Sequence, residues 1–215
     1  MIEIVIACSG AVISFIALWI SIYQIHLSNK HHLFDRRFKI YTVLDDFISG
    51  YLEFKSSKLT PLLGNYPSEE LHLDFLKLTS VRSLKSVSDA LIAFDQFMDI
   101  KLMMKKLEEF ESYGREAKIV FKKKLGKQVS YFIENYSNVL VSLTFYQNHL
   151  ADCCQKSYAI REQTGTIGNF SIEDKENEKD FREKVYFAYK ELDRAYKVIM
   201  EEKIMEAIKK TLKLW

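Results

Sequence analysis

The chain opens with an uninterrupted apolar segment. No charged side chain occurs from Ile4 to Tyr23. Twenty residues of helix span about 30 Å, which is the thickness of the hydrocarbon core of a bilayer. A buried core helix is the alternative, but so long an uncharged run favours a membrane span. The pattern therefore predicts one N-terminal transmembrane helix.

The residues at the far end of this segment predict its orientation. Aromatic rings that suit the membrane–water interface are followed by basic residues, whereas only Glu3 precedes the segment. Because basic residues stay in the cytoplasm, we expect the N-terminus outside a bacterial inner membrane and the rest of the chain inside. A cleaved signal peptide would need a basic leader and a small-residue cleavage site, which we do not find. The expected interface residues are Trp19, Tyr23, Lys30, Arg36 and Arg37.

Small residues recur within the apolar segment at spacings of three and four. Such spacing places them on one face of a helix, where two backbones can approach closely and pack together. The pattern predicts a packing face between copies of the chain, and hence a homo-oligomer. These residue types are also common in membrane helices generally, so ordinary composition remains the alternative. The face consists of Ala7, Gly10, Ser14, Ala17 and Ser21.

Beyond residue 29 the apolar positions follow the 3.6-residue period of helices. Only seven glycines and two prolines occur in the chain, too few turn residues for a many-stranded sheet. We therefore expect an all-α protein with a transmembrane anchor and stalk over 1–29 and a cytoplasmic domain over 30–215. That domain is expected to be an antiparallel bundle of about four or five long helices.

Turn residues and charge clusters set the expected boundaries within this domain. The first helix has no Gly or Pro before it as far back as Tyr23, so it is able to continue the membrane helix as a stalk. The expected elements are a helix over 34–51, a loop over 59–67, a helix over 68–78, a break within 79–88, a helix over 90–113, a central buried helix over 118–151, an exposed loop over 163–179 and a last helix from 181 almost to Trp215.

The overall charge balance excludes a strongly basic or strongly acidic protein. There are 31 basic and 29 acidic residues, so no overall field favours nucleic acid or an acidic substrate. Two local basic clusters stand out, and either could lie on anionic lipid, meet a nucleic-acid backbone or form an ordinary solvated face. They are Arg115, Lys118, Lys122, Lys123, Lys124 and Lys127, and Lys203, Lys209, Lys210 and Lys213.

Recognisable catalytic motifs are missing from the sequence. It has no phosphate-binding Gly-rich loop, no Gly-x-Ser-x-Gly elbow, no His-Glu-x-x-His motif and no paired Cys-x-x-Cys motif. We therefore expect no enzyme, no cofactor and no small-molecule substrate. His149 and Cys153 are four residues apart and could supply two metal ligands, but a third is not evident and a core pair is favoured. Asp45 and Asp46 point about 100° apart on a helix, so they do not form an acid–base pair.

Residues 34–41, Phe-Asp-Arg-Arg-Phe-Lys-Ile-Tyr, follow the predicted anchor directly. They resemble the start of the cytoplasmic domain in a loose group of uncharacterised bacterial single-pass membrane proteins. The shared pattern is Arg-x-x-Ile-Tyr, here Arg37, Ile40 and Tyr41, and the likeness covers about the first fifty residues. Some proteins of this kind resemble effectors of anti-phage systems, retrons among them. The resemblance implies a membrane-anchored defence effector.

Three hypotheses for function follow. The first is a non-enzymatic membrane-anchored protein that acts by self-association or by docking a cytoplasmic protein partner. The second is a membrane-disrupting toxin, because 135–151 is uncharged and just long enough to span, although polar residues such as Asn135 and Asn138 make insertion costly. The third is an enzyme or metal-binding protein that lacks a recognisable motif.

Overall fold

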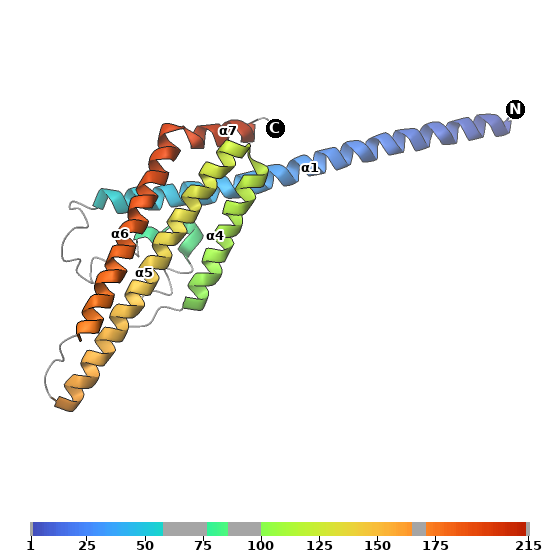
Figure 1. Ribbon diagram of the computed structural model, residues 1–215. Helices are drawn as coiled ribbons and strands as arrows, with labels where there is room; N and C mark the ends of the chain where they lie inside the picture. Colours follow the sequence, from blue (N-terminus) through green and yellow to red (C-terminus); the bar gives the residue numbers. More distant parts are fainter. Residues whose placement is uncertain (1, 58–76, 86–99, 165–170, 214–215) are drawn as a thin grey trace.

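The computed structural model describes residues 2–57, 77–85, 100–164 and 171–213, without the side chains of residues 2–12, 57, 100, 164 and 172. These residues form no strand, so the all-α prediction is confirmed. The elements are α1 (Ile2–Ser57), the 3-10 turn η1 (Arg82–Leu84), α4 (Ile100–Val120), α5 (Lys123–Thr164), α6 (Ile172–Glu201) and α7 (Ile204–Lys213) (Figure 1).

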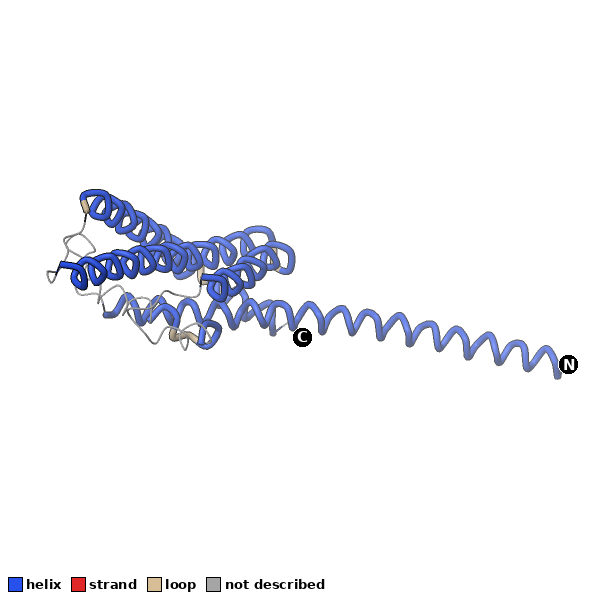
Figure 2. Tube along the Cα trace, turned by 90° about the horizontal axis from the view of Figure 1, so that it is seen from below, coloured by secondary structure: helices blue, strands red, loops and turns tan. Residues whose placement is uncertain are grey.

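The helices α4, α5 and α6 form an antiparallel layer, with α5 in the middle (Figure 1). The C-terminal half of α1 crosses this layer, while its N-terminal half projects far from the rest of the molecule (Figures 1 and 2). We call the projecting half the stalk and the remainder the body. The helical bundle was predicted correctly, but the antiparallel set described here has three long helices, because α1 crosses them instead of running alongside.

One continuous helix joins the stalk to the body. The helix predicted over 34–51 is part of α1, which runs unbroken from Ile2 to Ser57. Side chains from residue 13 to residue 32 are exposed, whereas Ile40, Leu44 and Phe47 are fully buried in the body. The expected continuation of the first helix into a stalk therefore matches the structure.

Part of the expected membrane segment falls outside the described side chains, since these begin at residue 13. Across the described residues, we find no helix with both the length and the apolar character needed to span a membrane.

The core is centred on α5, as expected from its wide apolar face. The ring of Phe47 in α1 stacks on Tyr136 at 4.1 Å between centroids and meets Phe110 of α4 edge-on at 4.8 Å. The buried Tyr136 hydroxyl donates a hydrogen bond to the Leu78 carbonyl oxygen at 2.7 Å. A Cβ atom at Gly50 would lie only 2.7 Å from that hydroxyl. Gly50 is therefore needed for close packing.

The boundary between α4 and α5 differs from the prediction. We expected a break at Gly114 and a helix over 118–151, but α4 continues to Val120 and α5 begins at Lys123. The turn is tight because Gly126 packs against the end of α4, where a Cβ atom would lie 2.4 Å from the Ala117 carbonyl oxygen. A glycine does allow the tight turn between the two helices, but it is Gly126 and not Gly114.

The loop predicted over 163–179 is also too long. Residues 165–170 lie outside the described part, but α5 reaches Thr164 and α6 begins at Ile172. The charged cluster forms the first turns of α6 because a capping box precedes it. The Ser171 hydroxyl oxygen accepts a hydrogen bond from the Asp174 backbone N–H at 3.0 Å, and acidic residues in a first turn oppose the helix dipole.

The last helix is divided, contrary to the prediction of a continuous one. Lys203 has a φ of 50°, which no helical residue adopts, and it separates α6 from α7. The turn lets α7 fold back onto α1, with Ile204 and Ile208 buried. Apolar periodicity continues through Lys203, so the sequence pattern alone does not reveal the change of direction.

Several predictions fall on residues outside the described part, namely the loop over 59–67, most of the helix over 68–78, the start of the helix over 90–113 and Trp215. The break within 79–88 is present, because η1 lies there. Asp46 holds it by accepting hydrogen bonds from the Ser83 backbone N–H at 3.1 Å and the Ser83 hydroxyl at 2.5 Å. Asp46 is thus a half-buried structural group.

Candidate functional site: the joint between stalk and body

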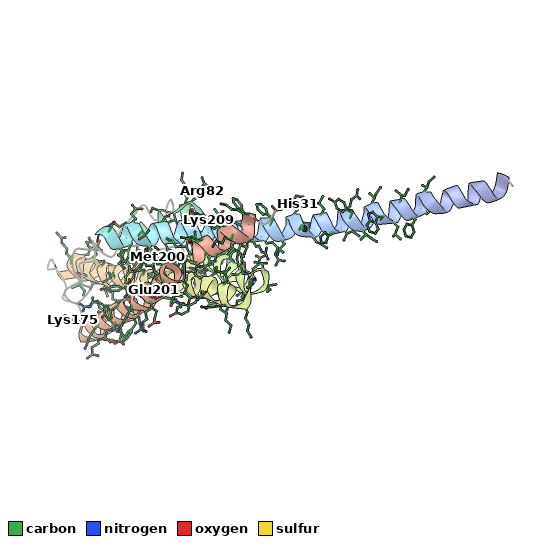
Figure 3. All side chains as sticks on the ribbon, turned by 90° about the horizontal axis from the view of Figure 1, so that it is seen from above. His31, Arg82, Lys175, Met200, Glu201 and Lys209 are labelled. Carbon is green, nitrogen blue, oxygen red and sulfur yellow. The ribbon has the colours of Figure 1, made fainter. Side chains whose placement is uncertain are left out.

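The place where α1 enters the body brings together three helices. Here α1 lies against the C-terminal end of α4 and against α7, and Figure 3 places His31 of α1 close to the edge of the body. We call this region the joint. Its residues are Arg36, Arg37, Ile40 and Tyr41 of α1, Glu116 and Val120 of α4, Phe121 after α4, and Lys209 of α7.

Arg37 fastens the end of α4 to α1. Its Nε donates a hydrogen bond at 2.9 Å to the carbonyl oxygen of Val120, the last residue of α4. The final carbonyls of a helix have no partner within the helix, so this bond satisfies an otherwise unpaired acceptor. The guanidinium carbon also lies 5.9 Å from the ring centre of Phe121. Burial lowers the pKa of Arg37, but a guanidinium remains charged at any physiological pH.

Arg36, the neighbouring residue, makes a different kind of contact. It forms an ion pair with Glu116 on the surface of the joint, where about half of the Arg36 side chain is exposed. Exposed ion pairs of this kind contribute little to stability. Both arginines were expected at a membrane interface, and the structure places them in contact with the body.

The other two residues of the Arg-x-x-Ile-Tyr pattern also lie in the joint. Ile40 is fully buried in the core, and the Tyr41 ring lies 6.5 Å from the Phe38 ring. The ammonium of Lys209 lies 5.8 Å from the Tyr41 ring centre, which links α7 to α1. In this chain the three residues of the pattern therefore connect the stalk to the body. Sequence reasoning missed this role because it depends on contacts with α4 and α7, which are distant in the sequence.

A second fastening lies further along α1, around the carboxylate of Asp193 in α6. The carboxylate accepts hydrogen bonds from the Tyr51 hydroxyl at 2.6 Å and from Lys55 Nζ at 2.9 Å, and Lys197 Nζ lies 2.8 Å from its other oxygen. Partial burial opposes ionisation of Asp193, but these partners outweigh it and hold the pKa of its carboxyl well below the usual range. Burial, followed by the bond to Asp193, raises the pKa of Tyr51.

Three residues of the expected packing face have described side chains, and all three are exposed on the stalk: Ser14, Ala17 and Ser21. The Ser21 hydroxyl donates a hydrogen bond to the Ala17 carbonyl oxygen at 2.9 Å, so it is satisfied within its own helix. The side chains of Ala7 and Gly10 lie outside the described residues. Trp19, Tyr23 and Lys30, the expected interface residues further along, are exposed as well.

The first basic cluster lies at the corner between α4 and α5, and all six of its side chains are exposed. Three of them have acidic partners: Arg115 pairs with Glu111 at 3.4 Å, Lys118 with Glu134 at 2.9 Å and Lys124 with Glu202 at 2.6 Å. The other three form no ion pair with a described residue and are Lys122, Lys123 and Lys127.

His149 and Cys153 are in contact, with 3.6 Å between Nε2 and Sγ. Nε2 also lies 3.3 Å from the backbone carbonyl oxygen of Asp174, and the imidazole packs 5.0 Å from the Phe181 ring. Burial raises the pKa of the Cys153 thiol, which disfavours the reactive thiolate. Among the described residues, no three His, Cys, Asp or Glu side chains gather as a metal site. The pair is therefore explained by packing between α5 and α6.

Comparison of the chain with protein-family models, with curated proteins and with solved structures gave no match.

Proposed function

We propose that this chain is a non-enzymatic protein, anchored in the bacterial inner membrane by the stalk, that acts by self-association or by docking a protein partner at the cytoplasmic face. The observation that carries the proposal is the unbroken α1. Its N-terminal half presents apolar side chains to the surroundings, and its C-terminal half is built into the core.

The exposed apolar surface of the stalk supports the anchoring. Its large side chains between residues 13 and 23 have exposed fractions of 49% to 71%. A protein in water rarely leaves so continuous an apolar surface uncovered, and the lipid of a bilayer would remove it from water. The side chains are Ile13, Phe15, Ile16, Leu18, Trp19, Ile20, Ile22 and Tyr23.

The orientation follows from the basic residues after the stalk. The first is Lys30, and further basic residues occur where α1 enters the body. Because such residues are retained in the cytoplasm, the body lies on the cytoplasmic side and the N-terminus lies outside.

Through the joint, association of two stalks would change how the two bodies are placed relative to each other. Because α1 is continuous and Arg37 and Asp193 fasten it to α4 and α6, a rotation or approach of two stalks moves two bodies with them. A partner that holds two bodies together would equally favour contact between their stalks. Binding at the body and packing in the membrane are thus coupled through one rigid element.

The resemblance around Arg37 extends the proposal to a role as effector in bacterial anti-phage defence. A rigid connection between membrane and cytoplasmic body suits a protein that converts a cytoplasmic signal into a membrane event. The observation that tests this part is the gene neighbourhood, where an effector is expected beside the genes of its sensor.

Self-association requires no rearrangement of the body, unlike the toxin hypothesis. Residues 135–151 lie in α5 between α4 and α6, and Asn135, Thr144 and Gln147 are buried there. Insertion of this segment would separate α5 from both neighbours and break the 2.5 Å hydrogen bond from Tyr146 to Glu178.

The proposal is tested by enlarging the expected packing face. Gly10→Leu combined with Ser14→Leu would hold two helices apart and remove contacts that lipid does not replace, at a cost of about 1 to 2 kcal/mol per interface. We expect weaker cross-linking of the full chain in native membranes, with the chain still resistant to carbonate extraction. The matched control, Val12→Leu with Ile16→Leu at positions on the far side of the helix, keeps the small residues and should cross-link like the parent.

Two outcomes would contradict the proposal. Equal cross-linking of the parent and the Gly10→Leu, Ser14→Leu variant would leave the stalk as a tether without a packing role. Release of the parent chain by carbonate would overturn the anchoring itself.

A further inference from the structure

We infer that the end of the body from which the stalk leaves is a docking surface for the anionic headgroups of the membrane. The inference rests on the proposed anchoring and gives a ligand to a surface that anchoring alone does not explain. The surface consists of Lys122, Lys123, Lys127 and Ile119 at the corner between α4 and α5, with Lys210 and Lys213 of α7.

These segments lie together although they are far apart in the sequence. Both the corner between α4 and α5 and the C-terminal end of α7 are at the end of the body where α1 emerges (Figures 1 and 2). Two described contacts fix this arrangement, namely the hydrogen bond from Arg37 to Val120 and the position of Lys209 over the Tyr41 ring.

Basic residues are concentrated at this end. The segments 30–39, 115–127 and 206–213 hold 13 of the 31 basic residues of the chain but only 3 of its 29 acidic residues. Two further acidic residues reach this end from outside these segments, Glu134 and Glu202, which pair with Lys118 and Lys124. The remaining sequence is therefore net acidic, although the chain as a whole is nearly neutral. A protein polarised in this way presents its basic end to an anionic surface and turns its acidic end away.

The corner lysines are available for an external ligand. Acidic side chains around the corner are already paired, since Glu116, Glu134 and Glu202 each contact a basic side chain. The exposed Lys122, Lys123 and Lys127 have no such partner among the described residues. A phosphate headgroup would supply one.

Ile119 distinguishes this surface from an ordinary solvated basic face. It lies in the last turn of α4, beside Lys118 and close in sequence to Lys122, and 75% of its side chain is exposed. An exposed apolar side chain between Lys118 and Lys122 in the sequence matches the two components of the membrane interface, where lysines meet phosphates and the apolar group enters the acyl boundary.

The length of the stalk brings the surface within reach of the headgroups. Leu27 is the last exposed large apolar residue before Lys30, and Arg36 in the joint lies nine positions further along the helix. Nine helical residues span about 14 Å, of which the headgroup layer occupies about 5 to 8 Å. The remainder is comparable to the Debye length of about 8 Å, so lysines at this level experience the surface potential.

The test is lysine footprinting of the full chain with a membrane-impermeant acetylating reagent, read by mass spectrometry. The chain is reconstituted in vesicles of phosphatidylcholine alone, or with about one-third phosphatidylglycerol. We expect Lys122, Lys123 and Lys127 to be labelled about three- to five-fold more slowly in the anionic vesicles, and high salt to remove the difference. The internal controls are the exposed Lys175 and Lys179 of α6, whose labelling should not change; Figure 3 shows Lys175 at the opposite end of the body.

A matched pair of variants tests the apolar component. Ile119→Glu should weaken the protection of the corner lysines, whereas Tyr158→Glu, at a position 61% exposed in the distant part of α5, should leave it intact. Both positions are on the surface, so neither change disturbs the core. Equal protection in the two variants would contradict the role of Ile119.

The result that overturns the docking surface is equal labelling of the corner lysines in both kinds of vesicle while the chain resists carbonate extraction. Extraction by carbonate would overturn the anchoring, and the docking with it. Protection by added duplex DNA, with none by anionic vesicles, would assign the surface to nucleic acid and reject the headgroup.

Discussion

At the joint, the side chain of Arg37 satisfies the final carbonyl of α4. Arg37→Met keeps most of the apolar stem but removes the donor, which leaves the Val120 carbonyl oxygen unpaired. We expect the free energy of unfolding to fall by about 1 to 3 kcal/mol, because the lost bond involves a charged donor and a partly buried acceptor. The measurement is urea unfolding of the full chain in detergent, followed by circular dichroism at 222 nm.

Arg36 provides the matched control, since its ion pair with Glu116 is exposed. Arg36→Met should cost less than about 1 kcal/mol. If the two variants lost the same stability, Arg37 would act only as one more surface charge, and the proposed fastening of α4 would be wrong.

Asp193 makes the attachment of α1 to α6 dependent on pH. Its pKa is lower in the folded chain than in the unfolded chain, so the network stabilises the fold above the ordinary carboxyl pKa of about 4 and loses this effect as the pH falls below it. We expect Asp193→Asn to cost about 1 kcal/mol at pH 7. The difference from the parent should shrink towards pH 3 in urea titrations at the two pH values.

Asp180 of α6 is exposed and serves as the control for this measurement. Asp180→Asn should have little effect at either pH. A cost for Asp193→Asn that stays constant from pH 7 to pH 3 would show that the network acts through shape and not through the charge of the carboxylate.

Apolar periodicity was sufficient to predict most of the helical faces. The predicted core positions of α5 from Val129 to Tyr146 are buried, and Leu150 is half-buried. A helix between two neighbours needs a wide apolar face, and such a face is visible in sequence. Phe38 and Met104 fit the same spacing yet are exposed, since no described element covers their sides of α1 and α4. Periodicity identifies a face but does not say which neighbour occupies it.

Boundaries between helices were harder to predict because tertiary contacts decide them. Gly114 and Gly126 are both candidates for a corner, and only the packing of Gly126 on the Ala117 carbonyl distinguishes them. The Ser171 capping box was within reach of sequence reasoning, since a serine precedes an aspartate by three residues. The functions of Arg37 and Asp193 were not, because their partners on other helices are distant in the sequence: Val120 is 83 residues from Arg37, and Tyr51 and Lys55 are 142 and 138 residues from Asp193.

The break between α6 and α7 rests on one strained residue. Lys203 adopts a positive φ, which costs a side chain with a Cβ atom about 1 to 2 kcal/mol and glycine almost nothing. We expect Lys203→Gly to raise the free energy of unfolding by up to about 1 kcal/mol, part of the gain being offset by the greater flexibility of glycine in the unfolded chain. Urea unfolding of the full chain in detergent measures the change.

The control is Lys203→Ala, which removes the same side-chain charge but keeps the Cβ atom. It should leave stability nearly unchanged. Equal effects of Lys203→Gly and Lys203→Ala would attribute the change to the charge of Lys203 and would contradict backbone strain at the turn.

At the scale of the whole molecule, the two halves of α1 differ in how far the body covers them. The N-terminal half of α1 exposes large apolar side chains, whereas its C-terminal half supplies Ile40, Leu44 and Phe47 to the core. Charge follows the same division, because basic residues gather where α1 leaves the body and acidic residues prevail elsewhere. We propose anchoring from the exposed apolar half of α1, and orientation and headgroup docking from the basic residues where α1 leaves the body.

The most direct test of this account is the location of the body. A tandem reporter joined after Trp215 would carry a fluorescent protein that matures only in the cytoplasm and a phosphatase that is active only outside it. The full chain should be fluorescent, lack phosphatase activity and stay in the membrane fraction after carbonate extraction if, as proposed, the basic residues following the stalk retain the body inside. Phosphatase activity would contradict the orientation, and a fluorescent protein released by carbonate would contradict the anchor.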